Sequence, residues 1–165
     1  MFPGFQGGPH MNNIAAKAVA FHEALQPEFK DYAKQVVKNS QSLATALMDK
    51  GFKLVTNGTD NHLILIDMPK SFEIDGREAQ NILDEIGLTA NCNAIPNDTL
   101  PPFRPSGLRL GTPAITTRGL QESDMTQIAA WMHQAITSRS DTSKLAQLKK
   151  QVVDFAKQYP LPSDR

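Results

Sequence analysis

The chain has 165 residues, 40% of them apolar and 21% charged, which is a composition typical of a single globular domain with a sizeable core. Its 17 basic and 17 acidic side chains balance, so charge gives no argument for a nucleic-acid partner or an anionic membrane surface. The single cysteine argues against an internal disulfide, and the four histidines are too scattered for a zinc site. No apolar run approaches the length of a membrane span, and we predict a cytoplasmic protein.

Residues 1–10 are predicted to form a glycine-rich loop. Gly7 and Gly8 stand side by side, and consecutive glycines let bare backbone N–H groups approach an anion closely. A helix is expected directly after the loop, and its positive end also attracts anions. The alternative is a tight turn that simply precedes a helix.

Two helices are predicted next, over residues 11–26 and 27–50. Apolar residues recur at spacings of three and four in the first, which predicts one buried stripe, formed by Ile14, Ala18, Phe21 and Leu25. The second carries a longer apolar face, and Gly51 follows as a natural end to the helix.

The period then changes to that of strands. Residues 52–56 alternate and predict a strand, and residues 62–68 form a short apolar run that predicts a strand covered on both faces. Residues 77–87 predict a short helix with Ile82, Leu83 and Ile86 facing inward.

The last third is predicted to mix extended segments and helices. Residues 88–95 read as a strand or extended segment, and residues 96–107 hold four prolines and exclude a regular element. Residues 108–116 read as extended, and a helix follows within residues 117–139. A final amphipathic helix is predicted from the spacing of Leu145, Leu148, Val152, Phe155 and Tyr159. Two long helices followed by strands alternating with helices predict an α+β fold.

Arg109 is the strongest candidate for a binding residue. It lies between two glycines in the extended stretch before a Thr-Pro pair, and its planar guanidinium matches the two oxygens of a carboxylate. The alternative is a surface arginine on an edge strand. Arg104 and Arg118 are interpreted as ordinary surface or loop charges.

Asn93 is a second candidate, within the stretch NCNAIPND. Its amide offers both an acceptor and donors to the edge of a heterocycle, although an Asx turn ending a strand is the alternative. Cys92 is interpreted as a small buried residue. No set of nucleophile, base and acid emerges from the sequence, so no catalytic residue is predicted.

Four stretches occur in one order that resembles the C-terminal portion of serine hydroxymethyltransferases. The resemblance runs from Phe2 to about Ser138 and rests on FPGFQGGPHMNNIAAKAVAF, TDNHLILIDM, NCNAIPND and PSGLRLGTPAITTRG. It implies the C-terminal small domain of a fold-type I, aspartate-aminotransferase-like enzyme that depends on pyridoxal 5′-phosphate. Such enzymes belong to one-carbon metabolism, interconverting serine and glycine and passing a one-carbon unit to tetrahydrofolate.

The resemblance also implies roles for individual residues. Arg109 matches the arginine that holds the substrate α-carboxylate, and Asn93 matches an asparagine that contacts the folate pterin. Gly7 and Gly8 match a glycine pair that meets the pyridoxal phosphate of the neighbouring subunit. The implied assembly is a homodimer or tetramer, without a metal.

One family feature is missing from the sequence. The cofactor lysine belongs to a threonine-rich segment ending in His-Lys, and these 165 residues contain no such segment. We therefore expect a fragment that begins mid-protein and is inactive alone. Its expected parts are a remnant of the large-domain junction (1–26), the small domain (27–138) and a terminal helix and tail (139–165). The alternative function is a non-catalytic α+β module that binds an amino acid or a protein; a threonine aldolase is disfavoured, because a folate contact has no purpose there.

Overall fold

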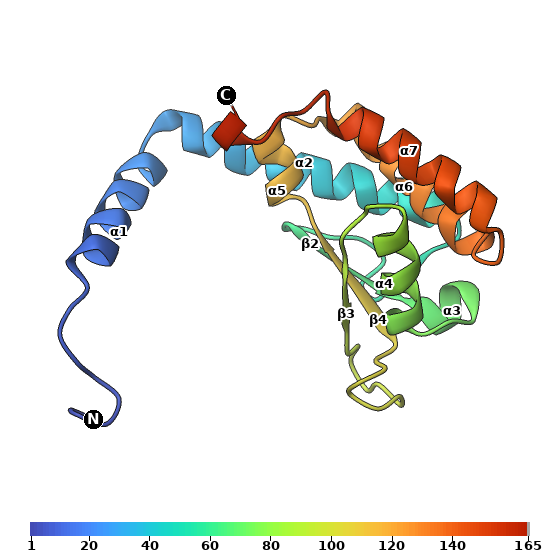
Figure 1. Ribbon diagram of the computed structural model, residues 1–165, viewed down its shortest axis with the longest axis horizontal. Coiled ribbons are helices and arrows are strands. Elements are labelled where there is room, and N and C mark those ends of the chain that lie inside the picture. Colours follow the sequence, from blue (N-terminus) through green and yellow to red (C-terminus); the bar gives the residue numbers. More distant parts are fainter. Residues whose placement is uncertain (165) are drawn as a thin grey trace. The chain divides into compact units, whose positions relative to one another are not determined.

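The computed structural model describes residues 1–164 (Figure 1). By its internal contacts the chain divides into two compact units, Met1–Lys34 and Gln35–Arg165. Each is described by itself. The long helix α2, Pro27–Asp49, begins in the first unit and contributes most of its buried face to the second.

The first unit consists of an exposed loop, helix α1 (Met11–Ala24) and the start of α2. The predicted helix over residues 11–26 is confirmed, but its predicted buried stripe is wrong. Every residue of α1 is exposed, with Phe21 68% and Leu25 78% accessible to solvent. The physical reason is that the loop of residues 1–10 is exposed as well, so this unit supplies no core for the stripe to face.

The second unit combines helices with a small sheet. Its further elements are β1 (Lys53–Leu54), β2 (Leu63–Asp67), α3 (Met68–Phe72), α4 (Gly76–Glu85), β3 (Asn91–Asn93), β4 (Gly107–Gly111), α5 (Pro113–Arg118), α6 (Glu122–Thr137), α7 (Thr142–Ala156) and the 3-10 turn Pro162–Asp164. The described residues form one four-stranded antiparallel sheet in the order β1-β2-β4-β3. This arrangement confirms the predicted α+β class.

The sheet has one covered face and one open face. Ile64, Ile66 and Leu108 point to the covered face and are at most 1% exposed, because they belong to the common core with the helices. Leu63 and Leu65 alternate with them and point to the other face, where Leu63 is 42% exposed. The prediction that residues 62–68 are covered on both faces is therefore wrong.

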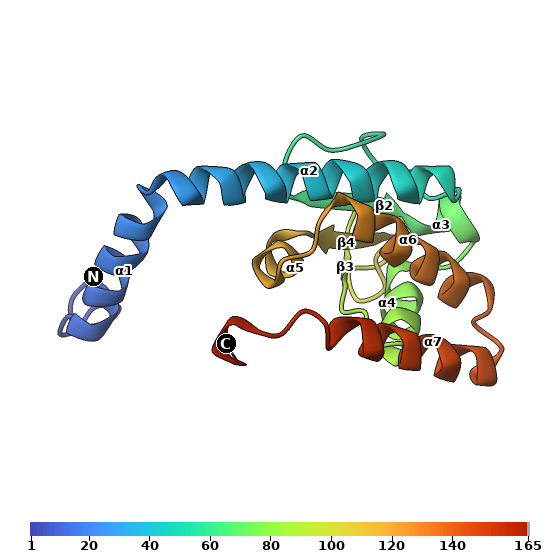
Figure 2. The same cartoon turned by 90° about the horizontal axis from the view of Figure 1, so that it is seen from above.

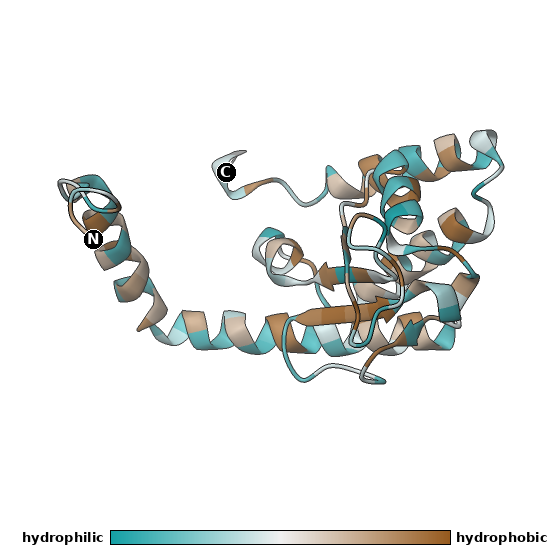
Figure 3. Ribbon diagram, turned by 90° about the horizontal axis from the view of Figure 1, so that it is seen from below, coloured by the Kyte–Doolittle hydropathy of each residue, from teal (hydrophilic) through white to brown (hydrophobic). Residues whose placement is uncertain are grey.

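Helices α2, α4, α6 and α7 supply the covering layer. Figure 2 shows α4, α6 and α7 gathered on one side of the strands. Figure 3 shows helices in which brown and teal segments alternate, as expected for amphipathic helices. Asp75 starts α4 and Asp141 starts α7, each accepting a hydrogen bond from the backbone N–H three residues later.

The extended segments are shorter than the sequence predicts. Residues 52–56 and 88–95 reduce to β1 and β3, and the predicted extended segment 108–116 is wrong in its second half. That half forms α5, which begins at Pro113. Gly119 follows its last residue, Arg118, and ends the helix with a left-handed φ of 105°. Helix α3 was not predicted; Asp67 caps its start and Pro69 lies in its first turn.

Candidate functional site

Arg109 occupies the middle of β4 on the open face of the sheet. The register places it directly opposite Leu65 on β2 and Asn91 on β3. Its side chain is exposed, whereas Leu108 beside it is fully buried on the helix side. The alternation of the strand thus presents one permanent positive charge on the face that the helices leave uncovered.

Asn93 meets Arg109 diagonally across the β3–β4 ladder. Arg109 Nη1 donates to Asn93 Oδ1 at 3.4 Å, and Asn93 Nδ2 donates to the carbonyl of Ala94 at 2.7 Å. Gly107 pairs with Asn93, and a Cβ at that position would collide with the Asn93 carbonyl and lie 3.1 Å from Leu65 Cδ1. Glycine at position 107 therefore permits the close approach of the two strands. The two predicted binding residues of this unit are brought together.

A shallow depression of about 450 Å³ surrounds Arg109 on this face. Its walls come from the ends of β2 and β4 and the start of β3: His62, Leu63, Thr89, Ala90, Asn91, Leu110 and Gly111. Among the residues that the structure describes, those lining this depression include no lysine and no carboxylate. A guanidinium without a competing acid nearby suits an anionic ligand group such as a carboxylate.

The proline-rich loop between β3 and β4 is organised by Asp98. Its Oδ1 accepts from the Leu100 amide at 3.0 Å and the Ser106 hydroxyl at 2.6 Å. Its Oδ2 accepts from the amides of Ile95 at 3.2 Å and Ser106 at 2.9 Å. These bonds, with the Ser106 hydroxyl first, hold the pKa of Asp98 far below its usual range. The sequence analysis missed Asp98; the available signal was an aspartate in the turn PND before a run of prolines.

The same loop packs closely on the start of α4. Arg104 Nε donates to Asp75 Oδ2 at 2.7 Å, and the Gly76 amide donates to the Pro105 carbonyl at 2.8 Å. A Cβ at Gly76 would run into the backbone of Gly107 and lie 2.9 Å from the Pro105 carbonyl. Arg104 is an exposed loop residue, as predicted, and it also pairs with the carboxylate of Asp75, which is 8% exposed.

The segment after Arg109 is fastened by buried polar groups. Thr112 Oγ1 donates to the Val36 carbonyl at 2.9 Å, which ties the end of β4 to α2. Arg118 Nε donates to the carbonyl of Tyr159 (2.8 Å), just beyond α7, and its Nη2 donates to the carbonyl of Ala156 (2.6 Å), the last residue of α7. Arg118 is therefore a structural link to the C-terminal helix, and its interpretation as an ordinary surface or loop charge is wrong.

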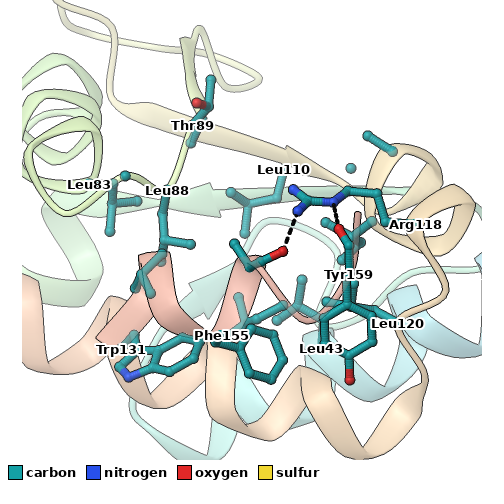
Figure 4. A pocket seen from close by; sticks show the side chains of 18 of the residues that line it. Leu43, Leu83, Leu88, Thr89, Leu110, Arg118, Leu120, Trp131, Phe155 and Tyr159 are labelled. Atoms are coloured by element: carbon teal, nitrogen blue, oxygen red, sulfur yellow. Dashed lines mark hydrogen bonds between the residues drawn. The ribbon is translucent and has the colours of Figure 1, made fainter. Parts of the chain in front are cut away.

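A larger cavity of about 600 Å³ lies on the helix side of the sheet (Figure 4). Leu88, Leu110, Trp131 and Phe155 contribute apolar walls, and the one charged group in its lining, Arg118, donates to the two backbone carbonyls. This cavity offers volume without a set of converging polar groups. The open face at Arg109 is therefore the better candidate for a functional site.

Gly7 and Gly8 lie in the exposed loop of the first unit. A Cβ added to either glycine would meet nothing within 4 Å, so internal packing does not require glycine at these positions. Cys92, predicted to be buried, is half-buried instead; it follows an exposed strand start, and its amide donates to Gln80 Oε1 at 2.9 Å.

Comparison with known proteins decides the family. The family model described as serine hydroxymethyltransferase matches residues 1–132 of the chain. The chain belongs to the serine hydroxymethyltransferase family. A serine hydroxymethyltransferase from Koribacter versatilis (strain Ellin345) is 49% identical over 164 residues, which is 99% of this chain and 38% of that protein. The chain thus spans well under half the length of this curated relative.

Residues 1–164 contain no group of three or more His, Cys, Asp or Glu side chains placed to hold a metal ion. No helix in the described part of the chain combines the length and hydropathy needed to cross a bilayer. Arg109 and Asn93, which the family resemblance singles out, lie together on the open face of the serine hydroxymethyltransferase chain.

Proposed function

We propose that this chain is the C-terminal part of a serine hydroxymethyltransferase that interconverts serine and glycine and transfers a one-carbon unit to tetrahydrofolate. Residues 27–138 are then proposed to be the small domain of a fold-type I enzyme, with 139–165 as its terminal helix and tail. The observation that carries the proposal is the exposed guanidinium of Arg109, aligned by Asn93 on the open face of the sheet.

Arg109 is proposed to hold the α-carboxylate of the amino acid. Glycine and serine share this group, so one arginine serves both directions of the reaction. The contact with Asn93 Oδ1 uses one N–H of Nη1 and orients the guanidinium on this face. The remaining N–H groups form the planar fork that a carboxylate accepts.

Asn93 is proposed to contact the pterin ring of the folate. Its Oδ1 accepts from Arg109 and its Nδ2 donates to the Ala94 carbonyl. An amide has two lone pairs and two N–H groups, so one acceptor site and one donor site remain for a heterocycle. Amino acid and folate would thus bind next to each other, which a transfer between them requires.

Pyridoxal 5′-phosphate is the cofactor that the family implies. When bound, it supplies an electron sink for cleavage of bonds at the substrate α-carbon. The residues of this chain fit only its periphery: Gly7 and Gly8 offer N–H groups that no packing contact obstructs, proposed to meet the phosphate of a neighbouring subunit. The residues described around Arg109 include no lysine to attach the cofactor.

The complete enzyme is proposed to be a cytoplasmic homodimer or tetramer that functions in glycine biosynthesis. The chain alone is expected to be inactive, because the 165 residues lack the threonine-rich His-Lys segment. This is tested by adding serine, tetrahydrofolate and pyridoxal phosphate to the purified chain and measuring glycine release. Sustained turnover would contradict the proposal. Saturable, tight glycine binding by the chain alone that Arg109→Ala abolishes would also contradict it, and would favour an amino-acid-binding module.

A chimaera tests directly whether this chain supports serine cleavage and whether Arg109 binds the substrate. The chain replaces the matching 164-residue stretch of the Koribacter enzyme, and serine cleavage is measured. We expect activity, and in Arg109→Lys a KM for serine raised on the order of tenfold or more, because an ammonium cannot bind both carboxylate oxygens in a fork. Arg77→Lys, an exposed arginine on α4, is the matched control and should leave KM unchanged. An inactive chimaera that folds would refute the proposed function, and equal KM values in both variants would refute the role of Arg109.

A further inference from the structure

One carboxylate connects the two ends of the loop that joins β3 to β4, residues 94–106. Asp98 accepts four hydrogen bonds, from the amides of Ile95, Leu100 and Ser106 and from the Ser106 hydroxyl. Ile95 is two residues after Asn93, and Ser106 is three residues before Arg109. A single side chain therefore bridges the segments that carry both site residues.

The ladder between β3 and β4 is too short to fix this geometry by itself. It has three register positions, Asn91↔Arg109, Cys92↔Leu108 and Asn93↔Gly107, and the loop starts directly after the last. A slip of β3 by one residue would turn Asn93 from the open face to the core face, whereas β4 and Arg109 are held by the five register positions shared with β2. A flexible loop of this length also pays an entropic cost for keeping its ends together.

We propose that Asp98 is a positioning residue for Arg109 and Asn93: it closes the loop so that β3 and β4 stay in the register in which Asn93 Oδ1 accepts from Arg109 Nη1. The geometric coupling stands on the contacts of this chain. Only the identity of the ligand, an amino acid next to a folate, rests on the proposed function.

Other contacts hold the loop at its C-terminal end. Arg104 pairs with Asp75, and the Pro105 carbonyl accepts from Gly76, so α4 anchors the side of the loop that leads into β4. Asp98 is the group that ties the N-terminal side, at Ile95, to this anchored side, at Ser106. Its loss should therefore loosen the β3 side and leave the β4 side in place.

The experiment compares Asp98→Asn with wild-type chain by amide hydrogen exchange and by NMR of the Arg109 and Asn93 side chains. An amide at position 98 turns an NH₂ group toward the donors and loses the charge. We expect exchange at Ile95 and Leu100 to be faster on the order of tenfold or more, the Asn93 and Arg109 side-chain signals to shift, and the Gly76 amide to stay within about twofold. Asp84→Asn, at an exposed carboxylate on α4, is the matched control.

The outcomes separate positioning from a general structural effect. Asn93 and Arg109 signals that stay in place while the loop amides exchange faster would overturn the proposal. So would faster exchange spread evenly over α4, α6 and the loop. If Asp98→Asn fails to fold, Ser106→Ala decides, since it removes only the 2.6 Å hydroxyl bond; it should shift the same two side chains, and unchanged signals there overturn the proposal.

A second arm uses the chimaera with the Koribacter enzyme. Asp98→Asn should raise KM for serine on the order of tenfold while kcat stays within about threefold, because Asp98 acts on binding geometry through Arg109. A loss confined to kcat would contradict the proposal. A wild-type chimaera without activity would refute the proposed function, and the side-chain signals would still decide the positioning role.

Discussion

The buried amide of Asn39 provides a quantitative test of how the segment after Arg109 is held. Asn39 lies on α2 and is 0% exposed. Its Nδ2 donates to Thr116 Oγ1 and to the Leu120 carbonyl, both at 2.9 Å, and its Oδ1 accepts from Gln35 at 2.9 Å. The bond to Thr116 ties α5 to α2, and the bond to Leu120 ties the segment just after α5 to the same helix, whereas the Gln35 bond lies within α2.

Asn39→Ala removes all three bonds and leaves a cavity and buried polar atoms behind. A net contribution of about 1 kcal/mol per hydrogen bond, with the Leu120 carbonyl left unpaired, gives a loss near 3 kcal/mol. The gain in helix propensity from asparagine to alanine offsets about 0.5 kcal/mol of that loss. We therefore expect the free energy of unfolding to fall by about 2.5 kcal/mol.

Urea denaturation measures this loss. Trp131 is the single tryptophan and is 5% exposed, so its fluorescence reports on the core that α6 shares with α2. With a slope of about 2 kcal/mol per molar urea, the midpoint should fall by about 1.2 M. Asn81→Ala, at an exposed position in α4, carries the same propensity gain and should lie within about 0.5 kcal/mol of wild type. If the two variants differ by less than about 1 kcal/mol, the buried amide does not hold α5 in place.

Two further outcomes follow from buried or half-buried polar groups. Ser40 is 0% exposed, and within the described residues its hydroxyl has no hydrogen-bond partner. Ser40→Ala should therefore leave the free energy of unfolding, measured in urea, unchanged or raise it by about 1 kcal/mol. A loss of similar size would show that the hydroxyl is hydrogen-bonded. Burial first, and then the charge of Lys50, lower the pKa of His133 below its ordinary 6.5. The unfolded chain then binds a proton at His133 more readily than the folded chain does, so the melting temperature should fall as the pH drops below about 6.5. His133→Gln should reduce this fall. An identical pH profile in the variant would contradict the role of His133.

The helices could be predicted because their signal is local. In α4 the residues Ile82, Leu83 and Ile86, chosen by their spacing, are 8%, 0% and 0% exposed. Gly51, predicted to end α2, has a φ of 89°. A period of 3.6 residues and a glycine in the left-handed region depend on the segment alone, so no knowledge of its neighbours is needed.

The sheet could not be predicted to the same extent, because its faces depend on partners distant in sequence. The apolar run of β2 is compatible with two covered faces, and only the packing shows that Leu63 and Leu65 lie on the open one. The Thr-Pro pair at 112–113 lies within residues 108–116, which the sequence predicts to be extended. Pro113 in fact starts α5, and proline suits the first turn of a helix as well as it suits a turn.

The site shows the same division. Arg109 could be identified from its glycine neighbours and the Thr-Pro pair, since these features lie within a few residues. The contact between Arg109 and Asn93 depends on the register of β3 against β4, and the bonds of Asp98 depend on the path of the whole loop. A sequence pattern identifies the residue type that binds, whereas the groups that orient it are set by tertiary structure.

The exposure of Arg109 explains why the proposed amino-acid site should need more than this chain. An ion pair between solvent-exposed groups contributes about 0–1 kcal/mol, which is far from the 4.1 kcal/mol of a millimolar complex. Leu63 and Leu65 flank the same face, and Leu63 is 42% exposed, so covering this face would bury apolar surface and remove water from the guanidinium together. A carboxylate bound in that drier surrounding gains far more from the same guanidinium. The open sheet face therefore has two expected consequences. The chain alone should bind glycine weakly, and the KM of the chimaera for serine should depend strongly on Arg109.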